Sequence, residues 1–163
     1  MDGQNRQNRK VREGTAMLHL VGLTTESMTK PICVDERIPR FSWKLISDHN
    51  GVMQKSYRIE IATKTGVVWD SGTVKSAQSL YIPYEGAALR PFTEYRWTVW
   101  IEDGGGDFAE ASSRFETGRM NTLWQAKWIC TQGKTDDDSR EPTYHFKKTF
   151  SLKRKPVRAR LYA

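Results

Sequence analysis

The sequence of 163 residues contains only two cysteines, Cys33 and Cys130, and three histidines. The cysteines form neither a Cys-x-x-Cys pair nor a Cys/His cluster, so no metal-site pattern is present and free thiols are favoured over one disulfide. No run approaches the roughly 18 apolar residues of a membrane span. Residues 1–15 lack the apolar stretch of a signal peptide. We therefore expect no metal, no cofactor and no membrane contact. The default location is cytoplasmic, and secretion stays open if a signal has been removed.

The net charge of +7 is concentrated at the two ends of the chain. Residues 1–13 carry four basic and two acidic residues, and residues 147–163 carry seven basic and no acidic ones. Residues 14–146 carry fifteen basic and seventeen acidic residues, so the central body is nearly neutral. A protein that binds nucleic acid usually has its basic groups on a folded face. We therefore predict no nucleic-acid partner.

From Ala16 onward, short apolar runs rich in β-branched and aromatic residues alternate with Gly, Pro, Asp and Asn. No stretch keeps a helical period, whereas several runs alternate apolar and polar residues as strands do. A single sheet cannot bury its apolar face alone, so two stacked sheets are expected. Residues 1–15 are polar and aperiodic, and we interpret them as a flexible leader. The predicted strands are Met17–Thr24, Arg40–Ser47, Ser56–Thr63, Val67–Asp70, Ser79–Pro83, Glu94–Glu102 and Ser112–Thr117.

Seven strands in about a hundred residues predict an all-β, immunoglobulin-like sandwich over residues 16–118. The run from Leu89 to Tyr95 is typical of a tyrosine corner, in which the phenol hydroxyl bonds the backbone of the preceding crossover. The run Phe115–Gly118 resembles the last strand of the fibronectin type III variant. The aromatic residues expected to fill the core are Trp43, Tyr57, Tyr95, Trp97 and Phe115.

Residues 119–163 contain two further strand-like runs, Tyr144–Leu152 and Val157–Ala163. Two strands cannot close a core, and the second run stops without a turn signal. We therefore expect the chain to be truncated and this part to be the start of a second, incomplete β-domain.

Eight segments in this order and spacing resemble the N-terminal region of bacterial α-L-rhamnosidases. The resemblance covers residues 17–163. It implies a fibronectin-like sandwich, then a jelly-roll-type β-domain, and much later an (α/α)₆ barrel that hydrolyses terminal α-L-rhamnose with inversion. The segments are Pro39–Trp43, Gln54–Ile59, Val68–Gly72, Tyr95–Trp97, Phe115–Gly118, Trp124–Ile129, Tyr144–Phe150 and Val157–Tyr162.

The same resemblance implies that the catalytic carboxyl groups lie on the barrel, so no catalytic residue is expected in this chain. Glycoside hydrolysis normally needs two positioned carboxyl groups. Residues 136–138 lack the spacing of a calcium loop, and residues 104–106 are interpreted as a hairpin loop. Four acids near the strand ends are expected to be solvated: Glu94, Glu102, Asp103 and Glu116.

Three aromatic residues, Trp100, Trp69 and Tyr81, are candidates for a binding role. Trp100 alternates with the inward residues of its strand and should point outward. An exposed ring can stack on a sugar or contact a neighbouring domain. Three functions stay open: an accessory region that contacts the remainder of an α-L-rhamnosidase-like enzyme, an autonomous module that binds rhamnose-containing glycans, and a fibronectin-type protein-interaction module.

Overall fold

The computed structural model describes residues 17–129, 145–157 and 159–161, so the predicted leader lies outside the described residues. The chain divides into two compact units, Met1–Leu123 and Trp124–Ala163. All strands belong to the first unit. Within the described ranges, no helix is long and apolar enough to cross a membrane.

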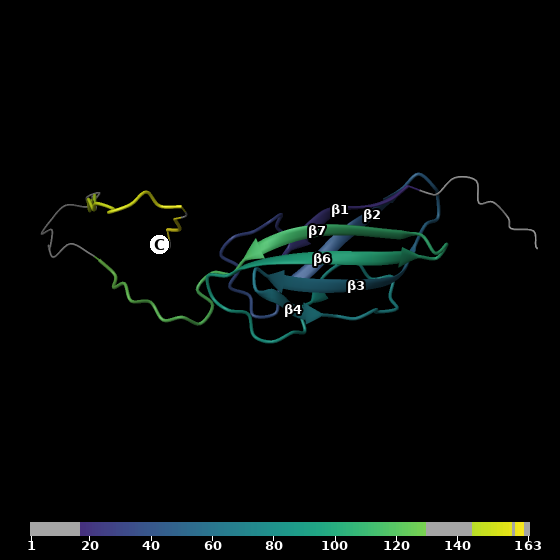
Figure 1. Cartoon of the computed structure of the whole chain (residues 1–163), viewed down its shortest axis with the longest axis horizontal. Helices are drawn as coiled ribbons and strands as arrows, with labels where there is room; N and C mark the ends of the chain where they lie inside the picture. Colours follow the sequence, from purple (N-terminus) through teal and green to yellow (C-terminus); the bar gives the residue numbers. More distant parts are fainter. Residues whose placement is uncertain (1–16, 130–144, 158, 162–163) are drawn as a thin grey trace, which may run out of the picture. The chain divides into compact units, whose positions relative to one another are not determined.

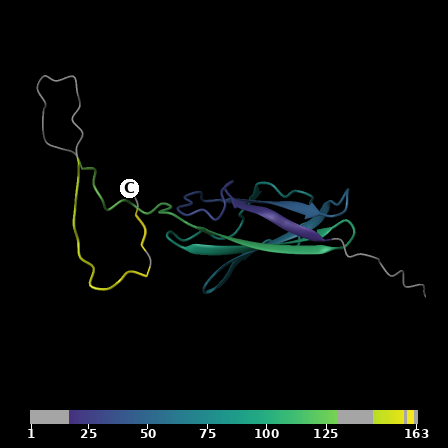
Figure 2. The same ribbon diagram turned by 90° about the horizontal axis from the view of Figure 1, so that it is seen from above.

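The first unit is a sandwich of two antiparallel sheets, drawn as two layers in Figures 1 and 2. This arrangement confirms the predicted all-β, immunoglobulin-like sandwich. The three-stranded sheet has the order β1-β2-β5, formed by Leu18–Thr25, Arg40–Ser47 and Ile82–Pro83. The four-stranded sheet has the order β4-β3-β6-β7, formed by Gly66–Asp70, Gln54–Thr63, Glu94–Asp103 and Phe108–Glu116.

Aromatic rings fill the space between the two sheets. Phe41 of β2 lies 4.9 Å from Trp97 of β6, measured between ring centroids, and 5.9 Å from Phe115 of β7. Trp43 of β2 meets Tyr57 of β3 edge-on at 5.4 Å. Trp43 and Trp97 are fully buried. Because each ring spans the gap from one sheet to the other, these contacts set the spacing of the sheets.

Gln54 satisfies the one polar atom of Trp43. The indole Nε1 donates a hydrogen bond to Gln54 Oε1 at 2.9 Å. The amide Nε2 of Gln54 donates to the carbonyl oxygens of Ser76 and Gln78. The buried side-chain amide of Gln54 therefore connects the β4–β5 connection to the centre of the sandwich. The N–H group of the indole has its hydrogen-bond partner inside the protein.

Tyr95 forms the corner that the sequence predicts. Its ring is buried and stacks on Phe115 at 5.2 Å. The backbone N–H of Arg90 donates to the Tyr95 hydroxyl at 2.8 Å. Leu89, next to Arg90, is also buried. The hydroxyl therefore fixes the β5–β6 connection where it turns into β6.

Two strands differ in length from the prediction by three residues, and the other five by two or fewer. The run Ser79–Pro83 is a strand only at Ile82–Pro83, because Tyr81 has φ +55° and interrupts the ladder with β2. The last strand begins at Phe108 and not at Ser112, so it pairs with β6 almost from the turn. Residues 104–106 form the predicted hairpin loop, with Gly106 at φ +87°.

The second unit differs from the prediction more strongly. The expected strands Tyr144–Leu152 and Val157–Ala163 are not formed at residues 145–157 and 159–161, and residue 144 lies outside the described part. Every described side chain of this unit is exposed, including that of Trp128. The physical reason is that a strand is stable only when a neighbour pairs with it and a second layer covers it.

Replacement of the corner tyrosine tests the role of its hydroxyl. We expect Tyr95→Phe to lower the free energy of unfolding by about 1–3 kcal/mol, because the N–H of Arg90 loses its acceptor while the ring packing is kept. Denaturant titration of the chain measures the loss. Tyr81→Phe is the matched control, since Tyr81 is 52% exposed, and its effect should be negligible. Equal stabilities of the two variants would contradict the assignment.

Candidate functional site

Trp100 lies on the outer face of the four-stranded sheet, and its indole is already engaged. Its Nε1 donates to Glu110 Oε2 of the paired strand at 2.5 Å. The guanidinium of Arg58 lies 5.3 Å from the centroid of the indole ring. The side chain is half-buried. One polar edge and one face of the ring are therefore occupied by neighbours within the same sheet.

The surface around Trp100 consists of paired charges. Arg58 forms a two-pronged ion pair with Asp70, at 2.9 and 2.6 Å. Lys55 pairs with Glu102 at 2.7 Å across β3 and β6. Exposed ion pairs of this kind add little to the free energy of unfolding, but each charge has a partner of opposite sign. The outer face of the four-stranded sheet is therefore a hydrated, internally paired surface.

Trp69 of β4 lies at the edge of the core. Its side chain is half-buried and meets Tyr84 edge-on, with the ring centroids 5.2 Å apart. The hydroxyl of Tyr84 donates to the carbonyl oxygen of Ala87 at 2.7 Å. Burial raises the pKa of this phenol. The contact connects β4 to the chain that follows β5, so the structure does not bring Trp69 together with Trp100.

Tyr81 lies on the other sheet, beside an ion pair. The guanidinium of Arg40 lies 5.3 Å from the centroid of the Tyr81 ring. Arg40 also donates to both carboxylate oxygens of Glu26, at 3.0 and 2.7 Å, and its backbone N–H donates to Glu26 Oε1 at 2.6 Å. The backbone N–H of Tyr81 donates to Ser42 Oγ at 2.9 Å. The three candidate rings thus lie in three separate places.

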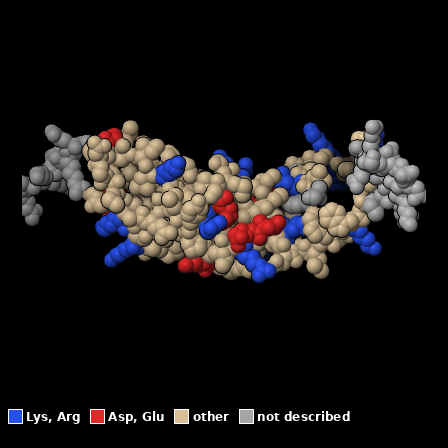
Figure 3. Space-filling model, turned by 180° about the vertical axis from the view of Figure 1, so that it is seen from behind, with Lys and Arg blue, Asp and Glu red and all other residues tan. Residues whose placement is uncertain are grey.

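The outer face of the three-stranded sheet carries exposed apolar side chains among charged ones. Figure 3 shows the molecule from behind: uncharged surface predominates, one group of acidic side chains lies near the middle, and other acidic and basic side chains lie apart from it. Sequence reasoning named only Tyr81 here. The alternation of β1 and β2 carries the missing signal, since residues between the buried positions must point outward. The exposed apolar residues of this face are Val21, Ile46, Leu80 and Tyr81.

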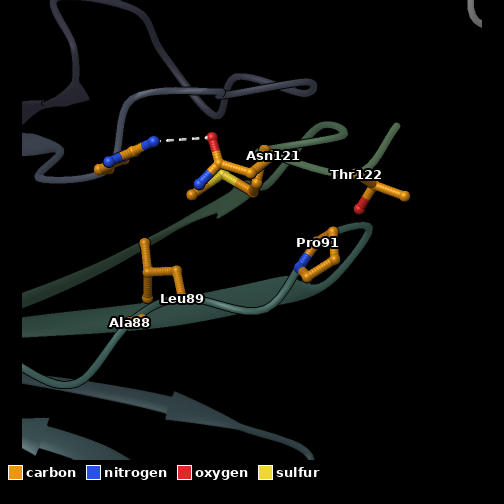
Figure 4. A pocket seen from close by; sticks show the side chains of 7 residues that line it. Ala88, Leu89, Pro91, Asn121 and Thr122 are labelled. Atoms are coloured by element: carbon orange, nitrogen blue, oxygen red, sulfur yellow. Dashed lines mark hydrogen bonds between the residues drawn. The ribbon is translucent and has the colours of Figure 1, made fainter. Parts of the chain in front are cut away.

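A cavity of about 380 Å³ lies where the chain leaves the sandwich. In Figure 4, Leu89 and Pro91 line it from the β5–β6 connection, and Asn121 and Thr122 line it from the segment after β7. Arg37 donates to Asn121 Oδ1 at 3.0 Å on its rim. No acidic residue is among the residues that line this cavity. Sequence reasoning missed it because its walls come from three distant segments.

Two of the four acids expected to be solvated are buried. Asp103 is 4% exposed, and its carboxylate accepts the N–H groups of Gly105 and Asp107 at 2.8 Å, closing the β6–β7 turn. Glu116 is 5% exposed at the end of β7. The interpretation as solvated was wrong for these two; for Asp103 the reason is that N–H groups of the turn satisfy its buried carboxylate, which the sequence does not reveal. Glu94 and Glu102 pair with Arg114 and Lys55.

Two carboxyl groups with arginine partners, those of Glu26 and Asp70, are held in the ionised form. Arg40 lowers the pKa of Glu26 through its hydrogen bonds, and Arg58 lowers the pKa of Asp70 in the same way. A general acid needs the opposite, a pKa raised toward neutrality. These arrangements are therefore typical of structural ion pairs and not of a hydrolytic acid.

The sheet order, the corner tyrosine and the interlocked core together define an immunoglobulin-type β-sandwich domain. A family model described as the "Rha78A-like, N-terminal immunoglobulin domain" matches residues 20–121. The chain belongs to this family.

Curated relatives give the match a context. The chain is 38% identical over 120 residues to an α-L-rhamnosidase of Streptomyces avermitilis, and covers 12% of that protein. It is 30% identical over 154 residues to an α-L-rhamnosidase of Formosa agariphila, and covers 16% of it. These matches take in 69% and 85% of the chain. The relatives are therefore α-L-rhamnosidases, and the chain corresponds to a small part of them.

Solved structures agree with this. The crystal structure of the Streptomyces avermitilis enzyme complexed with L-rhamnose matches 69% of the chain and 12% of that protein, with a TM-score of 0.65 and 36% identity. An α-L-rhamnosidase from "Dictyoglumus thermophilum" matches 69% of the chain and 14% of its own length, with a TM-score of 0.65 and 35% identity. The resemblance to α-L-rhamnosidases seen in the sequence is confirmed.

The ion pair beside Tyr81 predicts a pH dependence of stability. The pKa of Glu26 lies below its ordinary value of 4.5 in the folded chain, so the pair stabilises the fold above that pH. The contribution is lost as the pH falls through the folded pKa. We expect Glu26→Gln to be less stable than the wild type at pH 7, and the difference to shrink as the pH falls through the folded pKa of Glu26 and the carboxyl becomes protonated.

Thermal unfolding between pH 7 and about pH 2.5 measures this difference. Glu85→Gln is the control, because Glu85 is exposed and lies outside this pair. A stability gap between Glu26→Gln and wild type that stays constant across this range would contradict the interpretation.

Proposed function

We propose that this chain is a non-catalytic accessory region of an α-L-rhamnosidase-like glycoside hydrolase that acts on terminal α-L-rhamnose. The single observation that carries the proposal is the match of the sandwich to the N-terminal domain of such enzymes. The chain corresponds to 12–16% of the first curated relatives. Its partner in this role is the remainder of the parent enzyme.

The chemistry of the described surface supports the non-catalytic part of the proposal. Glycoside hydrolysis needs two carboxyl groups held on either side of a bound sugar, about 5–9.5 Å apart. The cavity beside Arg37 is lined without an acidic residue. Arginines hold the carboxyl groups of Glu26 and Asp70 in the ionised form. An accessory surface can contain such groups, whereas a general acid must carry a proton.

The apolar face of the three-stranded sheet supports a contact role. Ile46 and Leu80 are each 53% exposed, and the exposed Val21 and Tyr81 lie next to the charged Lys44 and Arg40. Apolar groups gathered on one face mark contacts more often than they mark sugar sites. A face of this composition fits a protein surface within the parent enzyme better than a hydrated glycan.

The second candidate function is an autonomous carbohydrate-binding module. Trp100 favours it, because the ring lies on an outer sheet face. The bonds to Glu110 and the position of Arg58 oppose it, since a sugar would have to compete for the indole edge and one face of the ring. We therefore rank this function below the accessory role.

The purified chain should release no chromophore from an aryl α-L-rhamnoside. The reason is that two positioned carboxyl groups are required, and the cavity found among the described residues is lined by none. The intact Streptomyces avermitilis relative, assayed at the same concentration, is the positive control. Turnover that rises in proportion to the amount of the chain would falsify the non-catalytic assignment.

Titration with rhamnose-containing oligosaccharides separates the two candidates. We expect no saturable heat or change of tryptophan fluorescence, because the accessible part of the Trp100 ring is already reduced by Arg58. If binding appears, Trp100→Ala should abolish it, and Trp128→Ala, which removes a fully exposed indole of the second unit, should not. Binding with that pattern would establish the carbohydrate module in place of the accessory role alone.

A further inference from the structure

The segment that leaves β7 is bonded to the sandwich on both sides. The N–H of Gly118 donates to the carbonyl of Val34 at 3.0 Å, and the carbonyl of Gly118 accepts the N–H of Phe92 at 2.9 Å. Just before it, Thr117 is fully buried. Its hydroxyl donates to the carbonyl of Arg90 at 2.6 Å and accepts the N–H of Thr93 at 2.9 Å. The chain therefore leaves the sheet as part of the packed structure.

Asp35 holds the next turn of this segment. Its Oδ1 accepts the N–H of Met120 at 2.5 Å. The approach is close enough that a Cβ added to Gly118 would lie 2.7 Å from the same oxygen. A side chain at this position would therefore displace the carboxylate of Asp35 from its place beside the exit segment. The side chain of Met120 packs partly buried against the core.

Two arginines complete the attachment. Arg37 donates to Asn121 Oδ1 at 3.0 Å. Arg119 donates to the carbonyl of Thr122 at 2.9 Å and also to that of Leu123. The guanidinium of Arg119 lies 6.0 Å from the ring centroid of Phe92. Side chains from the loop before β2 therefore bond the exit segment, defined here as residues 118–123, at successive positions.

A flexible linker would be solvated and would make few bonds to its domain. We propose that Asp35 and Arg37 are positioning residues that fix the exit segment against the end of the sandwich, so that the polypeptide leaves this domain in one defined direction. This inference deepens the proposed accessory role. It rests on that role only for the identity of the part that the exit segment positions, which is the remainder of the parent enzyme. A domain that supports its enzyme needs a rigid point of departure, which these bonds supply.

Amide hydrogen exchange of the whole chain, followed by NMR, tests the proposal. Asp35→Ala and Gly118→Ala should speed the exchange of the Met120 N–H by more than about tenfold, because one removes the acceptor and the other displaces it. Amides of β3 and β6 should keep their protection, since Asp35 is exposed and outside the core. Asp35→Asn keeps an acceptor oxygen and should restore much of the protection.

Asp48→Ala is the matched control, because Asp48 Oδ1 also accepts an exposed backbone N–H, that of Met17 at 3.0 Å. Met17 precedes β1, which begins at the end of the sandwich away from the exit segment (Figure 1). Exchange at Met120 should not change in this variant.

Two results would overturn the proposal. One is an unprotected Met120 N–H in the wild type. The other is a loss of protection in Asp35→Ala that is equal at Met120 and throughout β6, which would make Asp35 a general structural residue. Neither result involves a sugar or a substrate, so failure here is distinguishable from failure of the accessory role, which rhamnoside turnover would reveal.

Discussion

The structure depends on one constraint: the apolar faces of two sheets can be removed from water only against each other. Phe41 on β2 packs against the rings of Trp97 and Phe115 on the opposite sheet. Trp43 on β2 packs against the ring of Tyr57 on that same opposite sheet. Large rings satisfy the constraint well, because each buries much apolar area and spans the gap between layers. The same rings limit what else the sandwich can contain. The space between the sheets is filled by side chains, so any binding must occur on outer faces, at edges or at the ends.

The parts of the fold that follow from the alternation of apolar and polar residues were predictable from the sequence. Runs such as that of Tyr57, Ile59 and Ile61 fix which side of a strand is buried, whatever its partner is. The corner at Tyr95 was predictable because its parts are six residues apart. What failed depends on backbone geometry and hydrogen bonds that alternation does not encode. The short β5 follows from the positive φ of Tyr81, and the burial of Asp103 follows from N–H groups of its own turn.

The candidate site was less predictable for the same reason. Alternation placed Trp100 on the outer face of its strand, but Arg58 and Glu110 reach its ring from two neighbouring strands. Trp69 lies next to the last residue of β4 and packs against Tyr84, which belongs to the chain after β5. An aromatic residue that the sequence predicts to be exposed can therefore still have its ring occupied by neighbouring side chains in the fold. The two outer faces differ in detail: Trp100 is surrounded by paired charges, whereas the other face combines the Arg40–Glu26 ion pair with exposed apolar side chains such as Ile46.

The asymmetry between the faces and the order of the exit segment bear on the same question, which is how a small sandwich serves a much larger protein. A domain that only tethered its neighbours would need neither feature. Here Gly118 leaves room for Asp35, and Thr117 is buried at the boundary where a linker would begin. Hydrogen bonds to charged groups contribute more than neutral ones, and those of Asp35 and Arg37 act on Met120 and Asn121 of the exit segment. The geometry therefore favours an exit segment that is held against the end of its own sandwich.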